Sequence, residues 1–469
     1  MGKVELESLG LGEAVRDRLR DCKLRGVPGS VSQERTHLVS PEPFALTRSQ
    51  LDRLRHLGDA LLAFYRAAND LYLRPGHDWA RSYLDIGKPD DVVRYGRMNF
   101  QKRSLPRVIR PDILITDDGR FVITELDSVP GGMGHLDCLS AAYEEAGFEL
   151  VGSPRGVRDR FATMLRDAAG ISDPACAIVV SEESADYLPE MAYLSGELRA
   201  SGLRVYTIRP DELSFTEEGL WVEADRERVR LDVVYRFYEL FDLMNIPKSE
   251  LVMYAAKKKL VTVTPPYKPY LEEKMLLALL HSPHLLEFWE SAIGCERLSM
   301  LSEMIAPTWI LDNRAVPPHA GISGFEWQGR PIRDWREIGH GTQKQRRLVL
   351  KPSGFSPLAW GSRGVKVGHD MSREQWAHSL EDALADFNSS PWVLQWFHDT
   401  QILRVYYYNE AAGTVGQMAA RVRLCPYYFV TDDRAHLAGV LATACPKDKK
   451  LIHGMVDAVI TPCRVEEKG

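Results

Sequence analysis

The sequence predicts a mixed α/β fold (α+β), one part of which contains a parallel sheet. Residues 177–208 run strand, helix, strand, an order typical of parallel strands because these need a crossover connection. Residues 1–100 have mostly helical periodicity, whereas the last third of the chain is rich in strand-like runs. The length of 469 residues is enough for two or three domains.

The composition excludes several classes of protein. The chain is 45% hydrophobic and 26% charged, its net charge is −6, and its basic residues are spread out, so we expect no nucleic-acid partner. No apolar run approaches the ~20 residues of a membrane span, so we expect no membrane partner. Seven scattered cysteines without a C-x-x-C pair predict reduced thiols in a cytoplasmic protein. The sequence contains no signal for the oligomeric state. A homo-oligomer is compatible with it.

The expected elements begin with helices and then a β-hairpin. Thr47 opens a segment of leucines at helical spacing, which we interpret as part of a packing and support region. The β-prone runs 113–115 and 121–123 are separated by Asp118-Gly119, a strong hairpin signal. A helix is expected at 136–146.

The hairpin would bring three carboxylates together. Asp112 at the start of the first strand would lie beside Glu125 and Asp127 at the end of the second, and residues two apart on a strand share a face. Carboxylates this close repel unless a cation lies among them, and such ligands suit magnesium held with substrate phosphates. Arg110 adds a fixed cation. A hairpin with a solvated acidic end explains the same residues equally well.

A second unit is expected from about residue 155. Residues 177–180 and 202–208 are strand-like around a helix at 187–201, and 233–238 continues the pattern, which indicates a small α/β domain. An oxidoreductase built on this unit is an alternative, but its first strand lacks a Gly-x-Gly-x-x-Gly turn. The partial match Gly131-Gly-Met-Gly134 also lacks the last glycine of that fingerprint, and we interpret this segment as a surface loop.

The remaining elements are a helix and several strands. Thr264-Pro-Pro interrupts the chain before a helix at 272–280. Strands are expected at 347–351 and 391–397, and a strand pair at 402–408 and 414–424 would be joined by a turn at 409–413.

A cationic site is suggested where the strand at 347–351 ends. Lys351 leads into a loop with Gly354, Gly361 and Gly364, whose backbone N–H groups can fold over phosphates, and Arg363 can hold a phosphate bidentately. The alternative is a lysine that protects a sheet edge. The loop does not match the Walker pattern, which argues against a P-loop enzyme.

Three further features have equally plain alternatives. Lys274 lies in the first turns of a helix, where a solvated lysine is the simpler interpretation. Arg421 and Arg423 share one face of a strand and suit an anion between them or open solvent. Residues 392–397 suit an adenine ring or a plain core.

Together these motifs resemble the circularly permuted form of the ATP-grasp superfamily, represented by the synthetase part of glutathionylspermidine synthase and related amide-forming ligases. Arg110-Pro-Asp112 is similar to the family's Arg-Pro-Asp, and Glu125-Leu-Asp127 stands in place of its Glu-x-Asn, so that an aspartate replaces the family's metal-binding asparagine. Lys351-Pro and the loop 361–364 resemble the family's Lys-Pro motif and its Gly-Arg loop. Residues 273–280 resemble the family's Asn-Lys-Ala-Leu-Leu segment, and residues 394–397 resemble its hinge strand. The carboxylates precede both lysines, which implies the permutation.

The resemblance implies a role for each residue. Asp112, Glu125 and Asp127 would bind Mg²⁺, and Arg110 would be catalytic. The residues expected to bind ATP are Lys274, Lys351, Gly361, Ser362, Arg363, Gly364, Gln395, Trp396, Phe397 and Arg421.

The resemblance also implies a domain organisation and an activity. The expected parts are a helical N-terminal region (1–105), a metal-binding hairpin segment (106–154), a Rossmann-like pre-ATP-grasp domain (155–262) and an ATP-grasp nucleotide-binding region (263–469). The expected activity is an ADP-forming ligase that joins a small-molecule carboxylate to an amine through an acyl phosphate. The alternative is an inactive ATP-grasp module for nucleotide binding or assembly.

Overall fold

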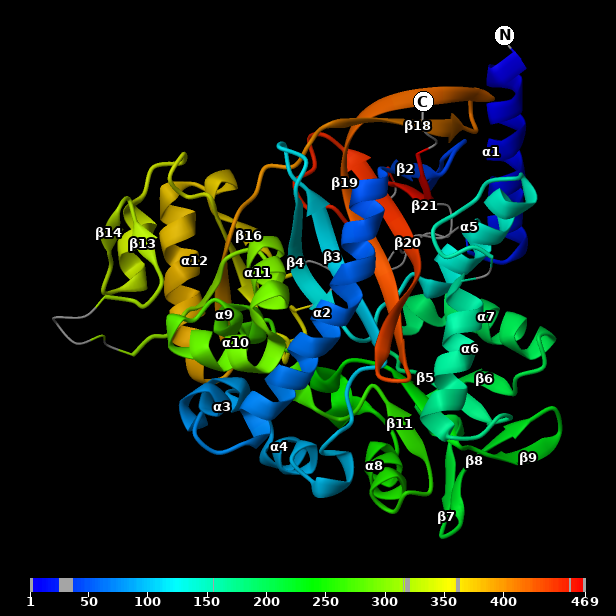
Figure 1. Ribbon diagram of the computed structural model, residues 1–469, viewed down its shortest axis with the longest axis horizontal. Helices are drawn as coiled ribbons and strands as arrows, with labels where there is room; N and C mark the ends of the chain where they lie inside the picture. The colour runs from blue at the N-terminus through cyan, green and yellow to red at the C-terminus, as the bar shows by residue number, and fades with distance from the viewer. Residues whose placement is uncertain are drawn as a thin grey trace.

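The computed structural model describes residues 3–24, 37–154, 156–314, 316, 321–359, 363–454 and 457–466, and a large curved sheet lies at its centre (Figure 1). In spatial order its strands are β18 (Leu403–Asn409), β1 (Leu38–Val39), β21 (Val459–Val465), β20 (Arg434–Pro446), β19 (Thr414–Thr431), β3 (Val108–Ile115) and β4 (Phe121–Asp127), with β2 (Phe44–Leu46) beside β21. Because β18 pairs with β19 as well as with β1, the sheet curls back on itself.

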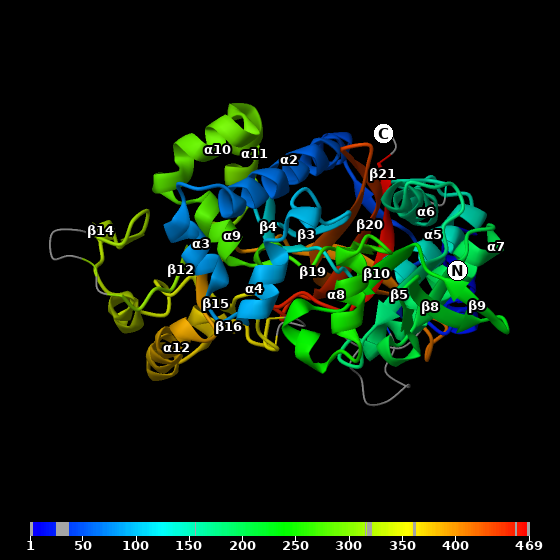
Figure 2. The same cartoon turned by 90° about the horizontal axis from the view of Figure 1, so that it is seen from below.

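Helices cover both faces of this central sheet (Figures 1 and 2). On one face lie α2 (Arg48–Leu73), α10 (Leu286–Ile293) and α11 (Cys295–Met304), and on the other lie α1 (Lys3–Asp21), α5 (Met133–Glu145) and α6 (Gly156–Ala169). Side chains of β19 alternate between the two cores: Leu424 and Tyr428 pack in the α2 core, whereas Tyr427 and Phe429 pack in the α5–α6 core. The second half of β19, from Leu424 to Thr431, is therefore buried on both faces.

The predicted start of α2 is confirmed. The Thr47 hydroxyl accepts from the N–H of Gln50, and the Gln50 side chain accepts from the N–H of Thr47, so the first turn is capped. In the third turn, Gly58 lets the helix approach the ring of Tyr428, whose hydroxyl donates to the carbonyl of Leu54 at 2.6 Å. A capped, closely seated α2 thus holds the face opposite α5 and α6.

The predicted parallel unit is also confirmed. Its sheet has the order β11 (Thr262–Thr264), β10 (Val233–Phe237), β5 (Cys176–Val180) and β6 (Val205–Ile208), with every pairing parallel. The crossover from β5 to β6 runs through α7 (Leu188–Ala200), and α8 (Ser249–Lys257) precedes β11. A small antiparallel sheet of β7 (Ser214–Thr216), β8 (Gly219–Ala224) and β9 (Glu227–Arg230) is inserted before β10.

A third sheet carries the segment of Lys351. Its order is β12 (Thr308–Ile310), β17 (Trp392–Trp396), β15 (Leu348–Pro352) and β16 (Lys366–Val367). It has its own apolar core, to which α12 (Arg373–Ala385) contributes Trp376. The hairpin of β13 (Glu326–Trp327) and β14 (Arg330–Pro331) lies beside it, and α9 (Met275–Leu280) connects it to the central core.

The structure refines the expected N-terminal region and the acidic hairpin. Besides α3 (Asp78–Asp85) and α4 (Asp90–Gly96), the first hundred residues supply β1 and β2, which the helical interpretation missed because they are only two and three residues long. The hairpin is confirmed, with Gly119 at φ +82° in its turn, and β3 and β4 belong to the central sheet. The four-part domain division remains a prediction.

Within the described residues, none of the helices combines the length and the apolar composition needed to cross a membrane.

Candidate active site

A cavity of about 430 Å³ lies where the central sheet, the parallel sheet and the loop after β15 meet. Residues that follow β5 and β10, among them Glu183 and Glu239, form one wall. In open α/β sheets, ligands bind at this carboxyl edge of the strands. The ends of β3 and β4 form the facing wall and bring the acidic hairpin into the same space.

Two arginines organise the carboxylates of the hairpin. The strand register sets Arg110 opposite Asp127 and Asp112 opposite Glu125. An Nη atom of Arg110 lies 3.1 Å from Asp112 and 3.0 Å from Asp127, and Arg423 of β19 lies 2.8 Å from the other oxygen of Asp112. Burial alone would raise the pKa of Asp112, but Arg110 and Arg423 outweigh it and lower this pKa, so Asp112 is an anion.

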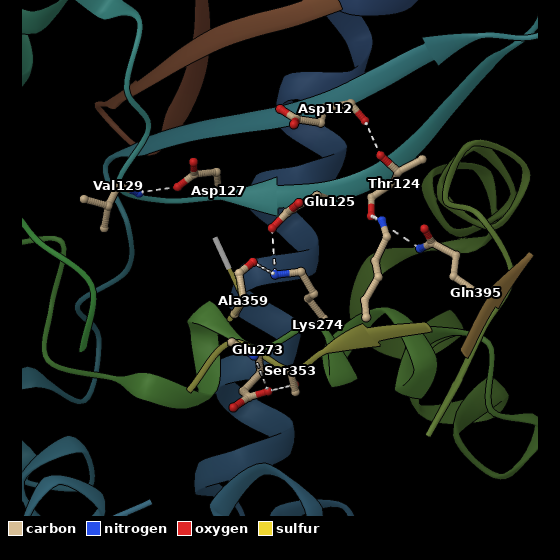
Figure 3. A network of polar contacts seen from close by, with 12 residues as sticks. Asp112, Thr124, Glu125, Asp127, Val129, Glu273, Lys274, Ser353, Ala359 and Gln395 are labelled. Atoms are coloured by element: carbon tan, nitrogen blue, oxygen red, sulfur yellow. Dashed lines mark hydrogen bonds and ion pairs between the residues drawn. The ribbon is translucent and has the colours of Figure 1, made fainter. Parts of the chain in front are cut away.

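Lys274 forms the second ion pair of the site (Figure 3). Its Nζ lies 2.7 Å from Glu125 and donates to the carbonyl of Ala359 at 3.0 Å. Burial lowers the pKa of Lys274, but Glu125 more than compensates, and the pKa is raised. Lys274 is the N-cap residue of α9 and precedes the helix in which it was expected. The contact with Ala359 connects it to the loop that follows Lys351.

Lys351 lies behind the acidic hairpin. Its Nζ donates to the carbonyl of Thr124 at 3.0 Å, and the Gln395 side chain donates to the same carbonyl at 3.3 Å (Figure 3). Burial is the main reason that the pKa of Lys351 is lowered to about 8, and Lys274 adds to the effect. The residue before Glu125 thus binds both the lysine of β15 and the glutamine of β17.

The structure brings most of the expected site residues together. Arg110, Asp112, Glu125, Asp127, Lys274 and Arg363 line the cavity. Arg363 also pairs with Glu183 at 2.9 Å, which connects the loop to the parallel sheet. Lys351 and Gln395 do not line the cavity, and both donate hydrogen bonds to the carbonyl of Thr124 in the hairpin.

Other expected residues lie elsewhere. Arg421 donates to Thr400 and to the carbonyl of Lys447, away from the cavity, and its neighbour Arg423 lines the cavity instead. Trp396 is 37% exposed, Phe397 packs against His369 with ring centroids 4.4 Å apart, and Gly364 donates its N–H to Leu358. Gly361 and Ser362 lie outside the described residues.

Sequence reasoning predicted three of the eight described acidic side chains that line the cavity and missed the other five, among them Glu190 and Glu239. Glu190 of α7 accepts from the N–H of Gly132 at 2.7 Å and pairs with His135 at 3.0 Å. The segment 131–135, interpreted as a surface loop, therefore lines the cavity, and His135 is buried. Glu239 lies two residues after the end of β10, and among the described residues its side chain has no hydrogen bond or ion pair. The rule that ligands bind at strand carboxyl ends is the signal that would have found Glu239.

Negative charge dominates the cavity wall. Its described lining includes eight Asp or Glu side chains and four Lys or Arg side chains. Burial, then Glu272 and Asp127, raise the pKa of Glu239 well above its usual range. An anionic substrate entering this cavity therefore needs added positive charge beside it.

The carboxylates fit Mg²⁺ unequally. Within the described residues, no group of three or more His, Cys, Asp or Glu is arranged to hold a metal ion. Asp112, expected as a ligand, uses both oxygens for Arg110 and Arg423. Asp127 also has a partner on each oxygen, Arg110 on one and the N–H of Val129 on the other. The difference lies in exposure, because 33% of the Glu125 side chain and 23% of the Asp127 side chain are accessible from the cavity, against 8% for Asp112. Two carboxylates with phosphate oxygens and water form a donor set that Mg²⁺ prefers, so Glu125 and Asp127 fit the ion.

Comparison with known proteins supports this description of the fold. No family model matches the chain, and no curated protein matches its sequence. The solved structure of a glutathione synthetase-like effector from Globodera pallida is similar over 97% of both chains, with 13% identity and a TM-score of 0.59. A structure described as a gamma-glutamylcysteine synthetase, from Methylobacillus flagellatus, aligns with 86% of this chain over 84% of its own length, at 12% identity. Its TM-score of 0.41 is too low to indicate a shared fold. The chain therefore has a mixed α/β fold of the glutathione synthetase-like type.

Proposed function

We propose that this protein is an ADP-forming ligase of the circularly permuted ATP-grasp type, which joins a carboxylate to an amine. One observation carries the proposal: the pair Lys274–Glu125, the Arg110 clamp and the loop after Lys351 meet at one cavity. The likeness in fold to a glutathione synthetase-like protein supports it. The permutation is supported by chain order, because the carboxylates at 112–127 precede Lys274 and Lys351.

ATP would bind in the cavity, between the acidic hairpin and the loop after β15. Lys351 and Lys274 would contact its phosphates, and the loop 352–364 would cover them and exclude water. Mg²⁺, held by Glu125 and Asp127, would supply the positive charge that lets a triphosphate enter an acidic cavity.

The reaction would proceed in two steps. A substrate carboxylate attacks the γ-phosphorus and ADP leaves, which gives an acyl phosphate. The nitrogen of the amine then attacks the acyl carbon, inorganic phosphate leaves, and the ammonium form loses two protons in total, one retained by the phosphate and one released. Arg110 lines the cavity and would stabilise the oxyanion of the tetrahedral intermediate. Glu239, which has no partner among the described residues, would receive the amine, whose positive charge would offset the raised pKa of Glu239 and favour its carboxylate.

A product screen tests this proposal. The protein is incubated with Mg·ATP and mixed panels of carboxylic acids and amines, ADP is measured by a coupled assay, and new amides are identified by mass spectrometry. Amide formation that requires ATP and disappears in Glu125→Ala is the expected result. Hydrolysis of ATP without any amide would contradict a ligase.

The second candidate function is a nucleotide-binding or assembly module without turnover. The observation in its favour is the fold neighbour, which is described as an effector. Saturable binding of Mg·ATP with no ADP release across both panels would favour the module over the ligase.

A further inference from the structure

A buried contact joins three distant segments beneath the cavity. Lys88 lies between α3 and α4, Glu273 directly precedes Lys274, and Ser353 begins the loop after β15. Lys88 Nζ lies 2.5 Å from Glu273, and the side chains are 0% and 1% exposed. The hydroxyl of Ser353 donates to the second oxygen of Glu273, which also accepts the N–H of Gly354 at 3.2 Å (Figure 3).

The backbone of the loop is pressed against the same segment. A Cβ added at Gly354 would lie 1.9 Å from the carbonyl oxygen of Glu272, so a larger residue there would displace the chain. The next residue, Phe355, places its ring 5.8 Å from Lys88 Nζ. Ser353 and Gly354 are thus fixed to the segment that carries Lys274, and Phe355 lies against Lys88.

Stability alone is a weak explanation for this contact. A buried ion pair loses much of its attraction to desolvation, and apolar residues of similar size often serve as well. Here the carboxylate has a second task that an apolar residue cannot perform, because one oxygen accepts two hydrogen bonds from the loop while the other faces Lys88. The Arg158–Asp137 pair is comparably buried, but it lies outside the cavity lining and contacts no part of the loop.

We propose that Glu273 is a positioning residue for nucleotide binding. It holds the start of the loop 352–364 at a set distance from Lys274, and Lys88 keeps the Glu273 side chain in place. The phosphates of ATP then meet the loop and Lys274 in one arrangement, without first ordering either. This inference rests on the proposed function, because it concerns the same nucleotide site.

The test measures the Kd of Mg·ATP by calorimetry, without acceptor substrates, beside thermal unfolding. Ser353→Ala removes one hydrogen bond and leaves Lys88 paired, so the unfolding temperature should hardly change while the Kd rises about tenfold. Glu273→Gln should raise the Kd at least as much and also lower stability. In the Glu273→Gln background, Ser353→Ala should add little, since both act through one contact. Asp137→Asn is the matched control and should lower stability with the Kd unchanged.

Each outcome decides between the alternatives. An unchanged Kd in Ser353→Ala overturns the positioning role, and so do additive effects in the double variant, which would mean that Ser353 acts on the nucleotide by itself. A raised Kd in Asp137→Asn would show that any loss of stability weakens binding, which also overturns the role. If Glu273→Gln does not fold, Ser353→Ala against Asp137→Asn still decides. Failure of the wild-type protein to bind Mg·ATP would instead refute the proposed function, and the inference with it.

Discussion

Binding of Mg·ATP should weaken as the pH rises through about 8, because the pKa of Lys351 is lowered to about 8. A lysine attracts phosphate only while it is protonated, so the charge of Lys351 is present below this pKa and lost above it. Lys274 keeps its charge over the same range because Glu125 raises its pKa. The pH dependence of Mg·ATP binding should therefore reflect the titration of Lys351 and not that of Lys274.

The size of the effect follows from the pKa. With a pKa of about 8, roughly nine-tenths of Lys351 is protonated at pH 7 and roughly one-tenth at pH 9, so the association constant should fall about tenfold. A lysine with an ordinary pKa of about 10.4 would lose only a few per cent of its charge over this range. The γ-phosphate of ATP is already ionised, since the second pKa of a phosphate is about 6.

Calorimetry at several pH values provides the assay. Titrations in two buffers of different ionisation enthalpy give the number of protons taken up on binding, which should be roughly one half at pH 8. Lys351→Arg keeps its charge and should give a flat profile, because a guanidinium does not titrate here. A flat profile in the wild-type protein without proton uptake would refute the reasoning, whereas no binding at any pH would refute the nucleotide site itself.

Three further predictions follow from the structure. Glu125→Ala should abolish ADP release while thermal unfolding still shows a folded chain, and wild-type rates would remove Glu125 from the site. Glu239→Gln should raise the KM of the amine and leave the Kd of Mg·ATP unchanged, and the opposite pattern would place Glu239 at the nucleotide. In urea denaturation, Gly58→Ala should lower the free energy of unfolding by about 1–3 kcal/mol, because the added Cβ would lie 2.6 Å from the Tyr428 ring. Gly196→Ala, whose added Cβ would have no atom within 4 Å, should raise the free energy of unfolding by up to about 1 kcal/mol. Equal changes in the two variants would contradict the close packing of α2 on Tyr428.

Features with a short-range signal could be predicted from the sequence. Asp118-Gly119 specifies the tight turn of the β3–β4 hairpin, and that turn sets the register of the pairs nearest to it, such as Ile113 with Ile123. The pairing of Asp112 with Glu125 needs in addition a bulge beside Asp112 that shifts the register by one residue. The order strand, helix, strand at 176–208 predicts parallel pairing, since a crossover leaves little other choice. In both cases the information lies within a few tens of residues.

Features set by long-range packing could not be predicted. The guanidinium of Arg423 meets Asp112 across 311 positions of sequence, and the alternation along the strand left Arg421 and Arg423 equivalent. Only the position of β3 beside β19 decides between them. Asp112 was expected to bind a metal for the same reason, because a carboxylate in sequence does not reveal which cations surround it. The unpartnered state of Glu239 is likewise visible only once its neighbours are in place.

The pairing of β1 with β21 has a consequence for synthesis in the cell. Leu38 lies opposite Val459, so a strand made early has this neighbour only after roughly 420 more residues have been translated. At ~5–20 residues per second the wait is roughly 20–80 s, during which β1 and β20 lack the strand that lies between them. Chaperones that cover unpaired strand margins should therefore raise the yield of native protein most when elongation is slow.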